Sequence, residues 1–335
     1  MNHHQVMEQY ARILQAYLAK KGEDQLYVAQ QLSKWLLVQN FSPEEVVDMH
    51  VRALEECGEL PDFIRETFHI LTEVMIEYGN AYRAIGSLRS KQQQMESELE
   101  VAAAMQQTLL PRQIPAFPEV EIGLVSVPAK QMSGDYYNFV QHDADTFSVA
   151  IADITGKGIP AAMCMSMIKY AMDSYDETKV APASMLLHLN RVAERNMDPS
   201  MFVTMVYGRY NVSSHRFRYA VAGHEPGFCY RSAEDCFYEL EGQGAALGVL
   251  EEPGFREYEI ALEPGDCLIL LTDGVTDRKN GRYYIQQEEF LSYLHSGVGS
   301  SAQEMADHLY RRLLLLSNFE LTDDYTMVVL RRLSG

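Results

Sequence analysis

Aspartates at the ends of predicted strands are the residues of this sequence with the clearest capacity for chemistry. Asp135 lies in Ser-Gly-Asp-Tyr-Tyr at the start of a short predicted strand, and Asp153 ends the run Phe-Ser-Val-Ala-Ile-Ala-Asp. Asp273 follows Cys-Leu-Ile-Leu-Leu-Thr, and the pair Asp323 and Asp324 directly precedes Tyr-Thr-Met-Val-Val-Leu. One aspartate at a strand end is usually a turn residue that accepts hydrogen bonds from backbone amides. Four such positions in one region, several beside a glycine, favour a shared site.

Carboxylates that are crowded together repel one another and need a positive charge to neutralise them. The sequence has no His and Cys cluster at zinc spacing, no H-E-x-x-H motif and no EF-hand loop. Oxygen ligands alone select hard cations such as magnesium or manganese. Two such ions about 3.5–4 Å apart can bind one water between them, lower its pKa and clamp a phosphate oxygen. The aspartates therefore predict hydrolysis of a phosphate ester.

Glycines and one histidine accompany the aspartates. Gly134 and Gly156 allow a positive φ or a close approach of the backbone to a ligand. The segment Thr155–Gly158 is similar to the end of a P-loop, but residue 151 is not glycine and no Ser or Thr follows Lys157, so we do not expect a nucleotide there. His224, in Ala-Gly-His-Glu-Pro-Gly, is either a hydrogen-bonded structural residue or a proton carrier.

The elements that would position these residues begin after a boundary marked by Pro111, Pro115 and Pro118. Beyond it the hydrophobic pattern predicts strands over 120–127, 147–152, 202–210, 215–221, 236–240, 267–271 and 325–330. Helical patterns lie between them, over about 159–174, 182–196, 287–295 and 302–316. Most strands follow one another through short joints. This arrangement favours an α+β fold with a largely antiparallel sheet and helices outside it.

The first 84 residues have a helical pattern throughout. Ser42, Pro43 and Glu45 form the start signal of a third helix, and Pro61 precedes a fourth. Short joints between four amphipathic helices predict a small helical bundle.

A separate segment, 85–109, carries a narrow apolar stripe at three-four spacing, in which Gln92 and Gln106 occupy two positions. Such a thin stripe favours a helix that pairs with another helix, and a single solvated helix is the alternative. The predicted organisation is a bundle over 1–84, a helical, coiled-coil-like linker over 85–118 and a catalytic domain over 119–333.

Composition narrows the class of partner. The 335 residues include 28 Lys and Arg against 47 Asp and Glu, so the formal net charge is −19. This balance argues against nucleic acid and against anionic membranes as partners. No apolar run approaches the roughly 18 residues that span a bilayer, and the start is not typical of a signal peptide. Five scattered cysteines fit free thiols in a cytoplasmic protein.

Five motifs, taken in order and spacing, resemble those of the metal-dependent protein phosphatases of the PPM/PP2C superfamily, and more narrowly its bacterial SpoIIE/RsbU branch. They are SGDYY, ADITGKGIPAAM, AGHEPG, TDGVTD and DDYT. Each motif is weak alone, and the set is specific. The resemblance extends over essentially the full chain, including the helical region and the linker. It implies a PP2C-like β-sandwich flanked by helices, preceded by an all-α bundle.

The resemblance also implies roles for individual residues. Asp135, Asp153, Asp273 and Asp323 match the family's metal-binding aspartates. The Ile154 carbonyl matches a backbone ligand, and Asp324, in the following position, is the second choice for the last aspartate. The ions would be two divalent cations, Mn²⁺ or Mg²⁺.

The match departs from the eukaryotic members of the superfamily at two positions. Thr155 stands where those members have a histidine, so no general acid carries over. Lys130 stands where they have a phosphate-binding arginine, and a lysine is a point charge rather than a bidentate fork. Lys130, Gly134 and His224 are therefore weaker candidates for substrate binding.

By resemblance, the expected activity is the metal-dependent removal of phosphate from a phosphoserine on an RsbV-like anti-anti-sigma protein, which switches on sigma-B stress transcription. The water between the metals would attack phosphorus in line, without a covalent intermediate. An RsbT-like kinase protein would activate the enzyme through the N-terminal bundle, which would also form a homodimer. The alternatives are the same phosphatase in another partner-switching pathway and an inactive partner-switching scaffold. No metal aspartate is missing from the sequence, which disfavours the scaffold.

Overall fold

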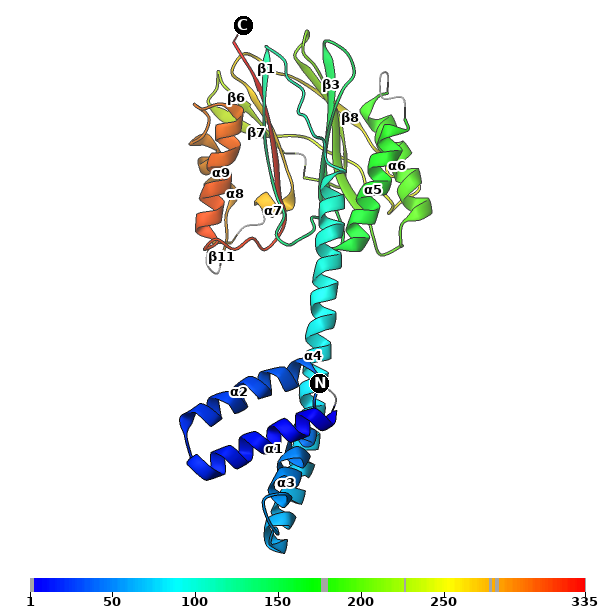
Figure 1. The fold of residues 1–335 in the computed structure, drawn as a ribbon. Coiled ribbons are helices and arrows are strands. Elements are labelled where there is room, and N and C mark those ends of the chain that lie inside the picture. The colour runs from blue at the N-terminus through cyan, green and yellow to red at the C-terminus, as the bar shows by residue number, and fades with distance from the viewer. Residues whose placement is uncertain (1–2, 176–179, 226, 277–278, 281–282, 335) are drawn as a thin grey trace. The chain divides into compact units, whose positions relative to one another are not determined.

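The computed structural model describes residues 3–334 apart from 176–179, 226, 277–278 and 281–282 (Figure 1). The chain divides into two compact units, Met1–Glu96 and Ser97–Gly335.

The N-terminal unit is helical, as predicted. It contains α1 (His3–Lys20), α2 (Glu23–Val38), α3 (Pro43–Glu55) and the first part of α4 (Asp62–Gln107). At the start of α3 the Ser42 side chain accepts a hydrogen bond from the Glu45 amide while the Glu45 side chain accepts one from the Ser42 amide, which is the predicted capping box. A small buried cluster of Val6, Leu32, Leu36 and Met49 holds α1, α2 and α3 together.

The helix α4 is continuous across residue 84, where the expected bundle ends. It runs unbroken for 46 residues, from Asp62 to Gln107, and so joins the expected fourth helix and the expected linker. No proline lies between Pro61 and Pro111, and the two internal glycines each cost about 1 kcal/mol, which a helix tolerates. The boundary between the two compact units falls within this helix, after Glu96.

The second unit contains two five-stranded antiparallel sheets. One has the order β1-β12-β9-β6-β7 and the other β2-β3-β4-β5-β8. The strands are β1 (Val120–Val127), β2 (Asp135–Gln141), β3 (Thr146–Ile154), β4 (Val203–Asn211), β5 (Arg216–Ala222), β6 (Phe228–Arg231), β7 (Cys236–Glu239), β8 (Glu257–Ala261), β9 (Cys267–Leu271) and β12 (Tyr325–Arg332), with a small β10 (Lys279–Asn280) and β11 (Tyr283–Tyr284) pair apart. The predicted α+β class is confirmed, and β6 and β8 are strands that the sequence analysis missed.

Helices cover the outer faces of the two sheets (Figure 1). One pair, α5 (Ile159–Asp173) and α6 (Pro182–Asn196), packs with the β2–β8 sheet, and the other, α8 (Gln287–His295) and α9 (Ala302–Leu316), packs with the β1–β7 sheet. A one-turn helix, α7 (Asp273–Thr276), follows β9. Within the described part of the chain, no helix is both long and apolar enough to cross a bilayer.

The strand β3, second in its sheet, carries a nearly continuous apolar run because both of its faces are covered. Its side chains alternate between two buried surfaces. Phe147, Val149 and Ile151 face the core between the sheets, while Ala150 and Ala152 face the layer of α5 and α6. Because both faces are covered, the polar aspartate is left to the end of the strand, where the apolar run stops.

Candidate active site

The strand pairing brings Asp135 and Asp153 directly opposite each other. Asp135 begins β2 and is the register partner of Asp153 near the end of β3. Asp153 also interacts electrostatically with Asp273, Asp323 and Asp324. The five acidic residues singled out in the sequence, from four separate segments, therefore gather at one end of the sandwich.

Asp135, Asp323 and Asp324 form hydrogen bonds or an ion pair with protein groups. Among the residues that the structure describes, no three His, Cys, Asp or Glu side chains form a group that would hold an ion. The individual contacts of the aspartates explain this arrangement and separate the roles of neighbouring residues.

Asp135 is the most buried of these carboxylates. Thr272 Oγ1 donates a hydrogen bond to Asp135 Oδ2 over 2.8 Å, and the Asp135 amide donates to Ser133 Oγ over 3.0 Å. Burial raises the pKa of Asp135 well above its ordinary value, hydrogen bonds from Thr326 and Thr272 oppose this shift, and nearby Asp153 adds to it. Because burial disfavours the charged form of Asp135, a cation next to this carboxylate would stabilise it strongly.

Asp153 is perturbed in the same direction. Burial, followed by the charges of Asp273, Asp323 and Asp324, raises the pKa of Asp153 to about 6, and Lys157 partly offsets the effect. The next residue, Ile154, is buried, and its amide donates a hydrogen bond to the Gly134 carbonyl over 3.1 Å.

The two consecutive aspartates before β12 have different surroundings. Asp324 is buried, and its Oδ1 accepts a hydrogen bond from the Ala129 amide over 2.7 Å while its Oδ2 accepts one from the Gly134 amide over 2.6 Å. Asp323 is half-exposed, and its Oδ1 lies 2.8 Å from Lys157 Nζ. The Asp324 carboxylate is thus committed to the backbone, which supports Asp323 as the metal ligand of the pair.

Two glycines allow the loops that carry these aspartates to touch. A Cβ on Gly134 would lie 3.0 Å from the Ile154 carbonyl oxygen and 3.1 Å from Asp153 Oδ1. A Cβ on Gly274 would lie 1.7 Å from the carbonyl oxygen of Asp324. Both glycines sit next to an aspartate because only a residue without a side chain permits this close backbone approach.

His224 lies inside the protein between the two sheets. Its Nδ1 is 2.8 Å from Thr204 Oγ1 on β4, and its Nε2 is 3.0 Å from the carbonyl oxygen of Leu271 on β9. Since a carbonyl can only accept, Nε2 carries the hydrogen and Nδ1 accepts from the threonine. Burial lowers the pKa of His224 to about 4, so the ring is neutral. Both ring nitrogens are engaged, which favours the structural interpretation over substrate binding.

Two lysines lie on segments beside the aspartates. Lys130 is exposed, next to Ala129, whose amide is bound by Asp324. Lys157 forms the ion pair with Asp323, and this hydrogen bond raises the pKa of Lys157. Sequence reasoning considered Lys157 for a P-loop and missed it as part of this site, although its place in Thr-Gly-Lys-Gly directly after Asp153 and Ile154 was a usable signal. Thr272 was also missed.

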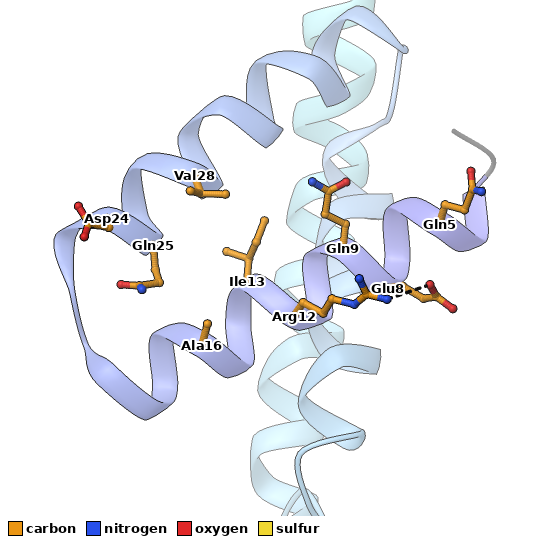
Figure 2. Close-up of a pocket in the computed structure, with 9 residues that line it drawn as sticks. All are labelled: Gln5, Glu8, Gln9, Arg12, Ile13, Ala16, Asp24, Gln25 and Val28. Carbon is orange, nitrogen blue, oxygen red and sulfur yellow. Dashed lines mark ion pairs between the residues drawn. The ribbon is translucent and has the colours of Figure 1, made fainter.

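Two hollows show where ligands or partners have room. A cavity of about 220 Å³ beside the end of β9 is lined by residues that include Leu271, Thr276, Phe228 and Glu225. A wider groove of about 650 Å³ lies in the N-terminal unit between α1 and α2 (Figure 2). Figure 2 shows Glu8 and Arg12 paired on its wall, and the lining contains amide and small apolar side chains but none of the aspartates described above.

The comparisons with known proteins agree with this arrangement. The family model of stage II sporulation protein E (SpoIIE) matches residues 143–333, and that of the N-terminal domain of phosphoserine phosphatase RsbU matches residues 8–81. The chain is 45% identical over 334 residues to phosphoserine phosphatase RsbU of Bacillus subtilis (strain 168), covering 99% of each protein.

Solved structures show the same fold for the second unit. The SiaA-PP2C domain of Pseudomonas aeruginosa aligns with a TM-score of 0.62 at 22% identity, over 72% of this chain and 98% of that domain. The structure of RsbX in complex with magnesium aligns with a TM-score of 0.51 at 16% identity, over 66% of this chain and 99% of that one. With the aspartates gathered at one end of a PP2C-like sandwich and a relative matched from end to end, the chain belongs to the RsbU family of PPM-type protein phosphatases.

Proposed function

We propose that this phosphatase removes phosphate from a phosphoserine of an RsbV-like anti-anti-sigma protein and thereby switches on sigma-B stress transcription. The observation that supports it most strongly is the match to RsbU of B. subtilis over 99% of both chains, because it includes the N-terminal region as well as the catalytic domain. The two alternatives, another partner-switching pathway and an inactive scaffold, are both compatible with the fold. An inactive scaffold would be expected to have lost metal-binding aspartates, whereas the sequence retains all of them.

The cofactor of the proposal is a pair of divalent cations, Mn²⁺ or Mg²⁺. The donor set fits them because it consists of carboxylates, one of them buried with a raised pKa, together with a backbone carbonyl. Asp135, Asp153, Asp273 and Asp323, with the Ile154 carbonyl, would hold the ions. When bound, they supply a water of lowered pKa and a positive clamp for phosphate oxygens.

The remaining residues of the site hold this donor set in place. Thr272 fixes Asp135, and Asp324 fixes the backbone on both sides of Lys130 through Ala129 and Gly134. Lys157 neutralises part of the negative charge at Asp323 and, being half-exposed, can turn toward a phosphate. The neutral His224 ring connects the two sheets through one hydrogen bond at each nitrogen, and its Nε2 hydrogen is held by the Leu271 carbonyl.

Regulation and assembly belong to the N-terminal part of the chain. We place binding of an RsbT-like kinase protein and homodimerisation there, since residues 8–81 match the RsbU N-terminal domain. Along α4 the apolar side chains of Ile85, Leu88 and Met95 are 49%, 67% and 64% exposed, which supports a helix partner for this stripe. We also place the protein in the cytoplasm, where a sigma factor acts.

Phosphate release from a phosphoserine RsbV-like protein tests the proposal. The full chain is assayed in Mn²⁺ and in EDTA, with and without an RsbT-like protein, beside Asp273→Asn and the exposed control Asp145→Asn. We expect turnover that needs Mn²⁺, rises with the partner, is lost in Asp273→Asn and is retained in Asp145→Asn. Turnover without a partner effect would move the N-terminal unit to another regulator, and no turnover from folded protein would favour the scaffold.

A further inference from the structure

A buried glutamine joins the end of α4 to the segment that carries Asp135. Gln106 is 6% exposed, whereas the preceding Met105 is 67% exposed and the following Gln107 is also exposed. Its Nε2 donates a hydrogen bond to the Ser133 carbonyl over 2.6 Å, and its Oε1 accepts one from the Ser133 amide over 3.0 Å. The side chain therefore points to the catalytic unit and not to a helix partner, which corrects its expected place in the apolar stripe.

The chemistry of this contact demands a carboxamide. A neutral primary amide is the side-chain group that offers a donor and an acceptor side by side in one plane, as the backbone of a single residue does. Both halves are used here, so the Gln106 side chain pairs with Ser133 much as a neighbouring strand would. The backbone amide and carbonyl of Ser133, a partly buried loop residue, thus both find their hydrogen-bond partner in one side chain.

The same loop is fixed at each of its next two residues. The Gly134 amide is bound by Asp324, and the Asp135 amide is bound by Ser133 Oγ. The carboxylate of Asp135 is bound by Thr272. Gln106 is therefore the first of a continuous series of contacts that ends on the most buried carboxylate of the site.

The other side of this helix turn is seated on the hydrophobic core. The Gln106 carbonyl accepts a hydrogen bond from the Leu109 amide over 2.9 Å. Leu109 and Leu110 pack against the cluster that contains residues of α5, Ala161 and Met165 among them. This turn therefore contacts the rest of the unit at two places, the hydrophobic core beneath α5 and the loop before Asp135.

We propose that Gln106 is a positioning residue, which transmits the seating of the C-terminal turn of α4 to Asp135 and so sets the affinity of the site for divalent metal. The proposal rests on the proposed function only for the assignment of Asp135 as a metal ligand.

The test uses the full chain and a matched pair of variants. Gln106→Met keeps the length and helix propensity of the side chain and removes both hydrogen bonds, while Gln107→Met makes the same change at the exposed neighbour. Amide hydrogen exchange over residues 129–136 is measured in EDTA, Mn²⁺ affinity is measured by electron paramagnetic resonance of free Mn²⁺, and turnover of p-nitrophenyl phosphate is followed against Mn²⁺ concentration.

For Gln106→Met we expect exchange in this segment to accelerate about tenfold and Mn²⁺ to bind about tenfold more weakly, the effect of one lost net hydrogen bond or a little more. Turnover should fall at limiting Mn²⁺ and return toward the wild-type value at saturation, whereas Gln107→Met should match the wild type. If the two variants behave alike in exchange and in Mn²⁺ affinity, the proposal is wrong.

A third variant covers the case in which Gln106→Met does not fold. Gln106→Glu retains the acceptor for the Ser133 amide and loses the donor for its carbonyl, so we expect accelerated exchange and weaker Mn²⁺ binding from it as well, and wild-type values would contradict the proposal. Exchange and Mn²⁺ binding need no phosphoprotein. A failure to act on an RsbV-like substrate would therefore overturn the proposed function and leave this inference standing.

Discussion

Thr272 Oγ1 lies 2.8 Å from Asp135 Oδ2 and donates a hydrogen bond to it. Thr272 Oγ1 also accepts a hydrogen bond from the Thr326 amide over 3.1 Å. Asp135 belongs to one sheet, while Thr326 and the strand before Thr272 belong to the other. One buried hydroxyl therefore connects the two sheets at the end of the sandwich where the aspartates gather, and it ties the geometry of the proposed metal site to the fold.

This relationship predicts the effect of Thr272→Val. The substitution keeps the shape of the side chain and leaves Asp135 and the Thr326 amide without their shared partner, so the free energy of unfolding should fall by about 1–3 kcal/mol. Urea unfolding measures the loss, and Thr276→Val, whose hydroxyl makes an exposed bond to Glu225, is the control. An equal, small effect of both substitutions would show that the buried hydroxyl has no special role.

Asp323 and Asp324 should respond differently to the same substitution. Asp324→Asn replaces one of two acceptor oxygens with a donor that faces a backbone amide, so it should lower the free energy of unfolding by about 1–3 kcal/mol. Asp323→Asn should leave unfolding in EDTA nearly unchanged and reduce Mn²⁺-dependent turnover at least about 100-fold. Urea unfolding measures the stability of each variant, and phosphate release measures its turnover. A large loss of stability in Asp323→Asn with a loss of turnover alone in Asp324→Asn would mean that Asp324 is the metal ligand and Asp323 the structural residue.

The metal-free protein should become less stable as the pH rises through about 6. A carboxyl whose pKa is raised by folding contributes stability that is fully present below its ordinary pKa of 3.8 and is lost as the pH passes the folded value, about 6 for Asp153. The contribution amounts to about 3 kcal/mol at most. Divalent metal binds the deprotonated carboxylates, so the stabilisation that it adds should grow over the same pH range.

Urea unfolding of the wild type and of Asp153→Asn, from pH 4.5 to pH 7.5 in EDTA and in Mn²⁺, checks the predicted pH dependence of stability. The difference between the two proteins should change with pH in EDTA and reverse its slope in Mn²⁺. A pH-independent difference would mean that Asp153 is not the perturbed group.

His224 should stay neutral at physiological pH. With a pKa lowered by burial to about 4, it contributes stability above pH 6.5, and this contribution is lost as the pH falls toward 4. The ring signals of His224 should not titrate between pH 5.5 and 8 in nuclear magnetic resonance spectra. His224→Ala should cost about 2–4 kcal/mol, since it leaves a cavity and an unpaired Leu271 carbonyl. Titration of His224 near pH 6.5 would contradict its place between the sheets.

Much of the fold could be predicted because local signals agree with it. The capping box at Ser42 and the apolar run of β3 mark their elements in the sequence alone, and the family motifs identify the sandwich. The strand β8 was missed because it is short and lies at the edge of a sheet, although Tyr258 and Ile260 alternate with Glu257 and Glu259 as in a strand with one solvent-exposed face. The continuity of α4 across residue 84 agrees with the absence of proline between Pro61 and Pro111, since the composition changes near residue 85 without a helix-breaking residue.

The sequence singles out the acidic residues that gather at the end of the sandwich, and their roles as metal ligands stay predictions. Strand-end positions single out Asp135, Asp153 and Asp273, and an adjacent glycine accompanies Asp135 and Asp273, since these features are local. The division of labour between Asp323 and Asp324 depends on which backbone amides lie within reach, and those amides come from residues about 190 positions earlier in the chain. The contact of Gln106 with Ser133 spans 27 residues and has no sequence signal beyond a polar residue in an apolar stripe.

The central claim is that the gathered aspartates form a metal-dependent phosphoserine phosphatase centre. It is tested most directly by measuring Mn²⁺ binding and phosphate release from a phosphoserine protein in the same samples of wild type and Asp273→Asn. We predict that the wild type binds Mn²⁺ and that phosphate release rises in parallel with the bound metal, and that the folded variant loses both. Phosphate release that persists in EDTA, or in Asp273→Asn without bound Mn²⁺, would contradict the account.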